Sequence, residues 1–323
     1  MTALHIEARR ESWPLAKPFS ISRGTKTTAE VIVASVSDGT HSGHGEAVPY
    51  SRYGESVEGV LEAVRGANFT SRLDLQRALP PGAARNALDC ALWDLEAKRD
   101  KRAAAGKAGF GSLKPCLTAY TISLGTPDEM AAAARDVPHL PLLKLKLGGL
   151  GDAQRLAAVH AARPDARLIA DANEAWTAAL LPELIAAAEA ARVETIEQPL
   201  PAGADAALEG VSTTIPICAD ESVHTSADLP HLRARYQAVN IKLDKAGGLT
   251  AALELHDLAR QQGFKIMVGS MVSTSLGVAP AFLLAQDADW VDLDGPLLLK
   301  HDRDGGFTIR DGLMVPAPAG LWG

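Results

Sequence analysis

The sequence LLKLKL at residues 142–147 is a short apolar run that carries two lysines. Seven comparable runs occur between residues 117 and 294, each followed by a stretch rich in Ala and Leu that is typical of a helix. The eight runs are 117–123, 142–148, 167–173, 194–199, 216–222, 238–243, 265–270 and 290–294. Apolar strands that alternate with helices indicate a parallel sheet covered on both faces. Eight units of about 25 residues fit a closed (β/α)8 barrel better than an open sheet.

The residues before this repeating pattern read as a mixed α+β region. Residues 30–36 alternate in the manner of a strand that ends at the turn 37–39, and residues 83–99 form an apolar stripe at helical spacing. The Gly- and Lys-rich stretch 106–115 is the best linker. We therefore expect an α+β domain at residues 1–112, a barrel at 113–297, and a C-terminal segment at 298–323 that packs back on the first domain.

Composition excludes several classes of protein. The 323 residues include 32 Lys and Arg against 39 Asp and Glu, a net charge of −7, without a basic block that would bind nucleic acid or an anionic membrane. There is no run of 18 apolar residues and no apolar leader at the N-terminus, so we expect a cytoplasmic protein. Cys90, Cys116 and Cys218 lack CxxC spacing and are expected to be free thiols.

A polar residue ends each of the eight apolar runs. These residues are spaced 22 to 28 positions apart, one strand–helix unit each. In a parallel barrel the carboxyl ends of all strands surround one mouth, which is where such folds place their active sites. We therefore expect these eight side chains to converge: Thr121, Lys146, Asp171, Glu197, Asp220, Lys242, Ser270 and Asp292.

Three successive runs end in carboxylates, at Asp171, Glu197 and Asp220. Three anions in one pocket repel one another unless a cation binds among them. Hard oxygen ligands that leave room for water and substrate suit Mg²⁺, with Mn²⁺ as a substitute. The alternative is that these acids are solvated or cap the helices that follow. Finding three in register favours the metal site.

Lysines flank the three acids along the sequence. Lys144 and Lys146 are two residues apart on one strand and share a face, and Lys242 ends a strand beyond the acids. A lysine beside another cation in a partly desolvated site has a lowered pKa and can act as a base. The alternative is a surface lysine whose stem covers apolar area. A metal ion between two amines suggests that one lysine removes an α-proton, the cation stabilises the enediolate, and the other lysine reprotonates the opposite face.

Together these residues resemble the enolase superfamily, specifically its muconate-lactonizing subgroup. The matching motifs are Lys144-Leu145-Lys146, Asp171-Ala172-Asn173, Glu197-Gln198-Pro199, Asp220-Glu221-Ser222, and Lys242 followed by Gly247-Gly248. The resemblance implies a modified (β/α)7β barrel with an α+β capping domain. It also implies a lysine base working with Mg²⁺, as is known for sites of this superfamily. The run 268–270 lacks histidine, which argues against the mandelate-racemase-like branch.

The resemblance also implies a role for each site residue. Lys146 and Lys242 would be the two acid/base catalysts, with Lys144 as a positive neighbour. One Mg²⁺ per subunit would be held by the three carboxylates Asp171, Glu197 and Asp220.

Asp292-Leu293-Asp294 resembles the DxD motif of dipeptide epimerases, in which the two acids bind the free ammonium group of the substrate. The alternative is an acid pair that meets solvent or caps a helix. The stretch 19–24 resembles L-Ala-D/L-Glu epimerases, and its Arg23 would pair with a carboxylate on the substrate side chain; the alternative is a surface salt bridge. Thr121 is expected to hydrogen-bond the substrate carboxylate. Ser273 stands where several relatives carry glutamate.

The leading hypothesis is a Mg²⁺-dependent dipeptide epimerase that acts on L-Ala-L/D-Glu from cell-wall peptides. One alternative is an N-acylamino acid racemase or an o-succinylbenzoate synthase of the same subgroup. A catalytically silent barrel is the non-enzyme alternative. The expected partner is a small dipeptide rather than nucleic acid or membrane, and the sequence allows a homo-oligomer.

Overall fold

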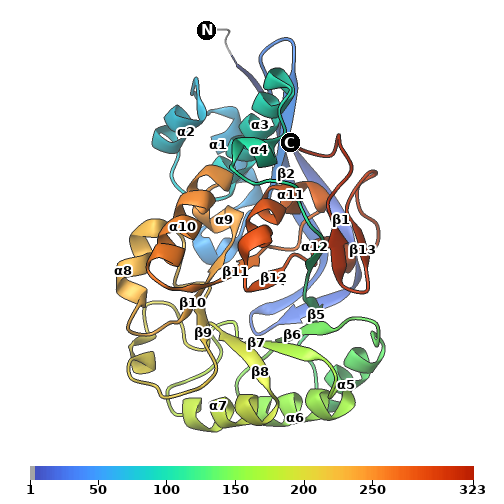
Figure 1. The fold of residues 1–323 in the computed structure, drawn as a ribbon, viewed down its shortest axis with the longest axis vertical. Coiled ribbons are helices and arrows are strands. Elements are labelled where there is room, and N and C mark those ends of the chain that lie inside the picture. The colour runs from blue at the N-terminus through green and yellow to red at the C-terminus, as the bar shows by residue number, and fades with distance from the viewer. Residues whose placement is uncertain (1–3) are drawn as a thin grey trace.

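The computed structural model describes residues 4–323 and contains the predicted barrel. Eight parallel strands form one sheet in sequential order (Figure 1). The expected modified (β/α)8 barrel, with an α+β domain beside it, is confirmed. The barrel strands are β5 (Tyr120–Ile122), β6 (Leu142–Lys146), β7 (Arg167–Asp171), β8 (Val193–Glu197), β9 (Ile217–Ala219), β10 (Ala238–Ile241), β11 (Lys265–Gly269) and β12 (Trp290–Asp292).

Helices cover the outside of the barrel. The three helices that follow β5, β6 and β7 pack side by side and lie along the bottom of Figure 1. The only helix after β12 in the described part of the chain is the single turn α12 (Gly295–Leu298), so the eighth helix of the barrel is vestigial. The other barrel helices are α5 (Pro127–Arg135), α6 (Asp152–Ala162), α7 (Leu181–Ala190), α8 (Leu229–Leu232), α9 (Leu243–Ala246), α10 (Leu249–Gln261) and α11 (Ser275–Leu284). Short 3-10 turns lie at Ala206–Leu208, Ser226–Asp228 and Ala285–Asp287.

An apolar layer fills the barrel immediately below its mouth. Six strands and the residue directly before β5 contribute one side chain each to a buried cluster: Ala119, Leu142, Ile169, Cys218, Ala238, Met267 and Trp290. Alternation along a strand sends every second side chain to the same side. The residue two positions after each member therefore also points into the barrel, one layer higher. Those residues include Lys144, Asp171, Asp220 and Asp292, so the apolar layer is the floor on which the polar site rests.

The seam between β5 and β12 is closed partly by side chains. The Ala119 amide donates to the Val291 carbonyl at 2.8 Å, and the Leu293 amide donates to Thr118 Oγ1 at 2.9 Å. At the mouth, the Thr121 amide donates to Asp294 Oδ2 at 2.7 Å. Asp294 thus takes part in joining the first and last strands of the barrel.

The N-terminal domain is a three-stranded antiparallel sheet with helices packed on it. Its strands are β1 (His5–Ile21), β2 (Gly24–Ser37) and β3 (Ser42–Ala47), and its helices are α1 (Val57–Arg65), α2 (Arg72–Ala78), α3 (Ala83–Asp100) and α4 (Ala104–Lys107). The helix predicted at 83–99 is α3. It lies so close to β3 that a Cβ on Gly43 would come within 2.1 Å of the Ala91 carbonyl oxygen. The β1–β2 hairpin reaches down towards the barrel mouth (Figure 1).

The C-terminal segment contacts the N-terminal domain. Strands β13 (Thr308–Arg310) and β14 (Leu313–Val315) pair with β4 (Cys116–Leu117) in a separate small sheet. Beyond them, the Gly323 amide donates to Asp94 Oδ1 at 2.9 Å and Trp322 Nε1 donates to the Cys90 carbonyl at 2.9 Å. We keep 1–112, 113–297 and 298–323 as proposed boundaries.

The structure also bears on the cysteines and on the length of the apolar helices. Cys90, Cys116 and Cys218 are free thiols. No helix within residues 4–323 has the length and apolar character needed to cross a membrane.

A buried carboxyl group joins the two domains. Asp244, on the single-turn helix α9 of the barrel, accepts hydrogen bonds from the Val48 amide and from Asn86 Nδ2, both at 2.9 Å and both from the N-terminal domain. Burial raises the pKa of Asp244 to about 7, although both hydrogen bonds favour its charged form.

Asp244 should make the protein less stable as the pH rises from 5 to 7. The folded protein keeps this proton until about pH 7, whereas the unfolded chain loses it near the ordinary value of 3.8. Because the folded state binds more protons in this window, raising the pH favours unfolding, by up to about 1.4 kcal/mol per pH unit for one group. Denaturant titrations at pH 5, 6 and 7 should show a shallower decline for Asp244→Asn than for wild type. An unchanged decline would contradict the assignment.

Candidate active site

Five consecutive strands deliver the predicted lysines and acids in the order lysine, acid, acid, acid, lysine. Lys146 ends β6, Asp171 ends β7, Glu197 ends β8, Asp220 follows β9 and Lys242 follows β10. Lys146 is the register partner of Asp171, which is the register partner of Glu197. Since β6 and β10 are four strands apart in a ring of eight, the two terminal lysines lie on opposite sides of the mouth.

Each acid of this row is paired with a lysine ammonium. Lys146 Nζ is 2.6 Å from Asp171 Oδ2, and Lys242 Nζ is 2.7 Å from Asp220 Oδ2. Lys144 lies deeper and is fully buried, with Nζ 2.6 Å from Glu197 Oε2 and 3.2 Å from Asp171 Oδ2. The structure therefore brings the predicted lysines and acids into one charged cluster.

Two further members of this cluster were not predicted from the sequence. Buried Lys245, on α9, places Nζ 2.6 Å from Asp220 Oδ1. Asn240 Nδ2 donates to Glu197 Oε1 at 2.6 Å. Asn240 carried a usable signal, because it precedes Lys242 by two residues on the same strand and so faces the same side. Lys245 carried no such signal, because it lies in a turn, where side-chain direction does not follow the two-residue alternation of a strand.

The pKa values follow from burial opposed by charge. Burial alone would lower the pKa of the Lys242 ammonium, but the Asp220 and Glu197 carboxylates outweigh it and raise that pKa. Lys144 is raised well above its ordinary value in the same way, by Asp292, Glu197 and Asp171. Carboxylates are thus the nearest charges to Lys144 and Lys242, and they outweigh the lowering of the pKa that burial and a neighbouring cation favour. A cation that engaged the carboxylates would remove this offset and leave burial favouring the neutral amine.

Glu197 is the acid of this row that the lysines compensate least, since they outweigh burial at Asp171 and Asp220 and hold those two pKa values below their ordinary range. Burial, followed by repulsion from Asp171, raises the pKa of the Glu197 carboxyl to about 6 even though Lys144 is in contact. Nearby, Asn173 Oδ1 and Glu221 Oε2 are buried oxygens without a hydrogen-bond partner. The raised pKa of Glu197 and the unpartnered oxygens favour an additional cation at this point.

The donor set fits a magnesium ion by its chemistry. Carboxylate oxygens on three adjacent strands are the hard ligands that Mg²⁺ prefers. Within residues 4–323, however, no three His, Cys, Asp or Glu side chains yet converge in metal-binding geometry. The lysine ammoniums hold the acids instead, and binding an ion would exchange these contacts for metal ones.

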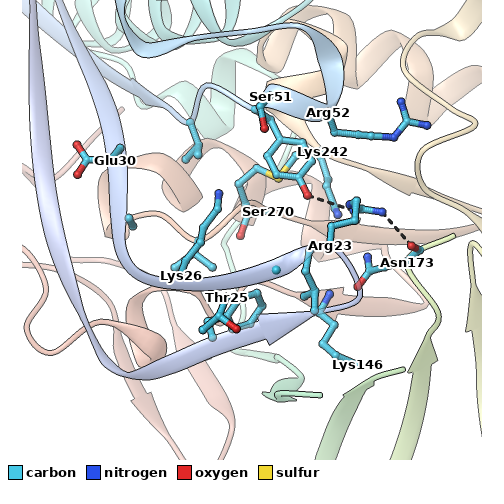
Figure 2. Close-up of a pocket in the computed structure, with 18 of the residues that line it drawn as sticks. Arg23, Thr25, Lys26, Glu30, Ser51, Arg52, Lys146, Asn173, Lys242 and Ser270 are labelled. Carbon is cyan, nitrogen blue, oxygen red and sulfur yellow. Dashed lines mark hydrogen bonds between the residues drawn. The ribbon is translucent and has the colours of Figure 1, made fainter. Parts of the chain in front are cut away.

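A cavity of about 380 Å³ lies between the barrel mouth and the loops of the N-terminal domain (Figure 2). Lys146, Asp220 and Lys242 line its barrel side, and Phe19, Arg23 and Tyr50 are among the residues that line its other side. This volume suits a small molecule of a few tens of atoms rather than a polymer. The two lysines that face it are the ones on opposite sides of the mouth.

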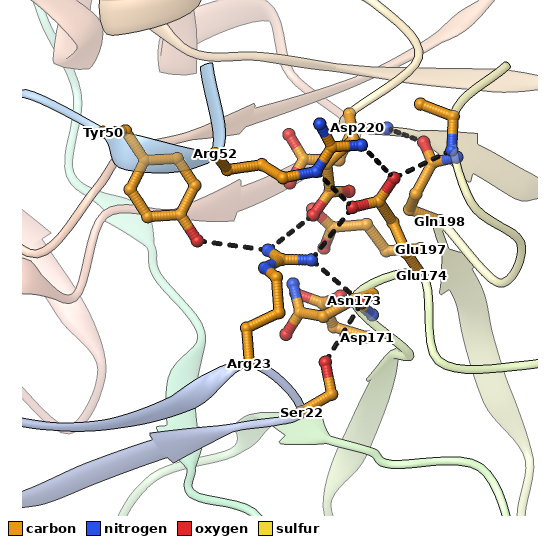
Figure 3. Close-up of polar contacts among 12 residues, drawn as sticks. Ser22, Arg23, Tyr50, Arg52, Asp171, Asn173, Glu174, Glu197, Gln198 and Asp220 are labelled. Carbon is orange, nitrogen blue, oxygen red and sulfur yellow. Dashed lines mark hydrogen bonds and ion pairs between the residues drawn. The ribbon is translucent and has the colours of Figure 1, made fainter. Parts of the chain in front are cut away.

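Arg23 lines the cavity but is already engaged. Its guanidinium donates to Glu221 Oε1 at 2.7 Å, to the Asn173 carbonyl at 2.9 Å and to Tyr50 Oη at 3.1 Å (Figure 3). A carboxylate on a substrate would have to share or displace these acceptors. Its predicted pairing with substrate stays a prediction.

Asp292, Asp294 and Thr121 lie outside the residues that line this cavity. Asp292 Oδ2 is 2.6 Å from Lys144 Nζ, and Asp294 accepts the Thr121 amide. Burial, followed by the charge of Asp292, raises the pKa of Asp294 to about 7. These residues adjoin the charged cluster, and their predicted substrate contacts stay predictions.

Two curated relatives span nearly the whole chain. An N-acetyl-D-glutamate racemase from Pseudoalteromonas sp. is 46% identical over 300 residues, covering 91% of this chain and 95% of the relative. An L-Ala-D/L-Glu epimerase from Escherichia coli strain K12 is 44% identical over 314 residues, covering 95% and 98%.

The fold is shared with solved structures. An enolase family member from Agrobacterium tumefaciens with homology to dipeptide epimerases, with bound sodium and L-Ala-L-Glu, is 49% identical. It superposes with a TM-score of 0.96 over 99% of this chain and 100% of its own. Solved dipeptide epimerases that are 26–27% identical to this chain are complexed with Mg and a dipeptide.

Two family models together match nearly the entire sequence. The mandelate racemase / muconate lactonizing enzyme N-terminal domain matches residues 3–105, and the enolase C-terminal domain-like model matches residues 129–321. With two relatives above 40% identity over more than nine-tenths of the chain, the assignment is unambiguous. This chain belongs to the enolase superfamily, among the mandelate racemase and muconate lactonizing enzymes.

Proposed function

We propose that this protein is a Mg²⁺-dependent dipeptide epimerase that inverts the α-carbon of the C-terminal residue of L-Ala-L/D-Glu. The observation that carries the proposal is the placement of Lys146 and Lys242 on opposite sides of a cavity, with three carboxylates on the strands between them. Inversion needs a proton removed from one face of a carbon and returned to the other. The 44% identical epimerase supports the dipeptide as substrate.

Asp171, Glu197 and Asp220 would hold the ion. When bound, Mg²⁺ supplies positive charge that stabilises the negative charge developing on the substrate carboxylate as the α-proton leaves. Lys144, buried between Glu197 and Asp171, contributes a fixed positive charge to the same region. The remaining chemistry belongs to the side chains of this chain.

The two terminal lysines would divide the proton transfer between them. For one diastereomer, Lys146 Nζ in its neutral form takes the α-proton and the ammonium of Lys242 donates one to the opposite face. For the other diastereomer the roles reverse, so catalysis in both directions needs one protonated and one neutral lysine. The apolar floor closes the barrel beneath the charged cluster.

N-acetyl-glutamate is the second candidate substrate. The 46% identical relative is an N-acetyl-D-glutamate racemase. The two acids expected to bind a free ammonium group, Asp292 and Asp294, instead contact Lys144 and the Thr121 amide and do not line the cavity. A substrate without an ammonium group would not need to contact these two acids. The same lysines would invert either substrate.

The reaction can be followed by ¹H NMR of L-Ala-L-Glu in D₂O with Mg²⁺. We expect loss of the glutamyl α-proton signal together with appearance of the L,D diastereomer, and faster turnover than with N-acetyl-L-glutamate in a parallel sample. Faster racemisation of N-acetyl-L-glutamate would favour the second candidate. Absence of exchange with both substrates, in protein that is folded and binds Mg²⁺, would contradict the proposal.

Replacing one lysine should leave exchange at only one face. Lys146→Met should lose about 10²-fold or more in epimerisation, since a positioned acid or base contributes about 10²–10⁴-fold. It should still exchange the α-proton of whichever diastereomer presents that proton to Lys242. Lys242→Met should show the opposite preference. Equal exchange of both diastereomers by either variant would contradict two opposed bases.

Asp294→Asn separates the two substrates. Asparagine can still accept the Thr121 amide, so the barrel seam is retained while the negative charge is removed. If Asp294 helps to bind the substrate ammonium, KM for L-Ala-L-Glu should rise about tenfold, while KM for N-acetyl-L-glutamate stays within a factor of about two. Equal effects on both substrates would show that Asp294 acts only in the seam.

A further inference from the structure

Glu174 joins two loops of the N-terminal domain to the barrel, and neither the proposed catalysis nor the sequence motifs account for it. It follows β7 by three residues and lies at the barrel mouth with its side chain 9% exposed. Its carboxylate receives four hydrogen bonds, which use both oxygens (Figure 3). A surface glutamate would ordinarily have solvent for most of these positions.

The four donors come from three separate segments. Arg52, in the 3-10 turn Ser51–Tyr53, donates from Nε to Oε2 and from Nη2 to Oε1, both at 2.8 Å. Arg23, in the turn of the β1–β2 hairpin, donates to Oε2 at 3.1 Å. The Ala202 amide, in the loop after β8, donates to Oε1 at 2.8 Å. One carboxylate thus connects two capping loops with two barrel loops.

The backbone turn at Asn173 and Glu174 supports this contact. Asn173 and Glu174 both have positive φ, 44° and 67°, a backbone region that residues other than glycine adopt only with strain. The turn presents the Asn173 carbonyl to Arg23 and to Ser22 Oγ at 2.9 and 3.1 Å. The hairpin turn is therefore held by two adjacent residues of the same strained segment.

The two loops held in this way form the roof of the cavity. Arg23 and Arg52 both line it, together with their neighbours Phe19, Tyr50 and Tyr53. Arg52 and Tyr53 also border a second cavity of about 730 Å³ between the domains, so their position sets the wall between the two spaces. Substrate enclosure depends on where these loops sit.

We propose that Glu174 is a positioning residue that clamps both capping loops onto the barrel and so sets the closure of the cavity over the substrate. It touches neither Lys146 nor Lys242, and it acts on the capping loops through Arg23 and Arg52. The clamp stands on the contacts alone, and it rests on the proposed function only for its kinetic readout.

Hydrogen–deuterium exchange of Glu174→Gln without substrate tests the clamp directly. Glutamine keeps an acceptor for the Ala202 amide but removes the charge that holds two arginines. We expect amides in residues 18–26 and 50–56 to exchange about tenfold faster than in wild type, the factor lost with one charge-assisted hydrogen bond. Unchanged exchange in both segments would overturn the proposal.

Two further variants distinguish a specific clamp from a general loss of stability. Arg52→Gln removes the same bidentate pair from the other side and should speed exchange in 50–56 to a similar degree, with little added effect in the double variant. Glu194→Gln is the matched control, because Glu194 makes an equivalent bidentate pair with Arg167 at the opposite end of the barrel. It should leave both loops unchanged. Faster exchange in Glu194→Gln as well, or fully additive effects, would contradict a specific clamp.

Kinetics then connect the clamp with catalysis. For Glu174→Gln we expect KM for L-Ala-L-Glu to rise about tenfold with kcat reduced by less than about threefold, because the loops position the substrate but do not handle the proton. A large fall in kcat at unchanged KM would contradict a positioning role. If wild-type protein does not epimerise the dipeptide, the proposed function fails, whereas the exchange experiment still decides the clamp.

Discussion

Buried negative charge at the barrel mouth is the constraint on which the site depends. Three successive strands each end in a carboxylate, and all three are removed from water. Such a row is tolerated only if positive charge lies against it. The structure supplies this charge from lysines on both flanks, which lower the pKa values of Asp171 and Asp220, whereas the pKa of the fully buried Glu197 stays raised. Under the proposed function, a metal ion would add positive charge beside Glu197, the acid that the lysines compensate least.

The same row explains why the lysines lie where a two-base reaction needs them. The acids occupy β7, β8 and the end of β9, so the strands on either side of the row are β6 and β10. In a ring of eight these two strands are opposite each other. Ammoniums that balance the ends of the acid row thus line the cavity from two sides. One arrangement of five strands meets the need for charge balance and, under the proposed function, the need for stereochemical inversion.

Much of this could be predicted from the sequence, because barrel strands obey two simple regularities. Alternation by two placed Lys144 with Lys146, and the spacing of about 25 residues per strand–helix unit placed Asp171, Glu197 and Asp220 at one mouth. The rest depends on contacts between distant segments. The return of Lys245 to Asp220, the positive φ of Glu174 and the seam role of Asp294 arise from loops whose geometry has no period. The pKa values of Lys144 and Lys242 are raised by the acids that contact them, which the alternation of residues along a strand does not reveal.

Titration calorimetry with Mg²⁺ tests the central claim that the three carboxylates form one cation site. We expect one ion per wild-type chain and much weaker binding for each of Asp171→Asn, Glu197→Gln and Asp220→Asn. Loss of an outer partner alone costs about 10–100-fold in metal affinity, so loss of a direct ligand should cost at least as much. Glu194→Gln, at the far end of the barrel, should bind like wild type. Wild-type affinity in all three folded variants would contradict the account.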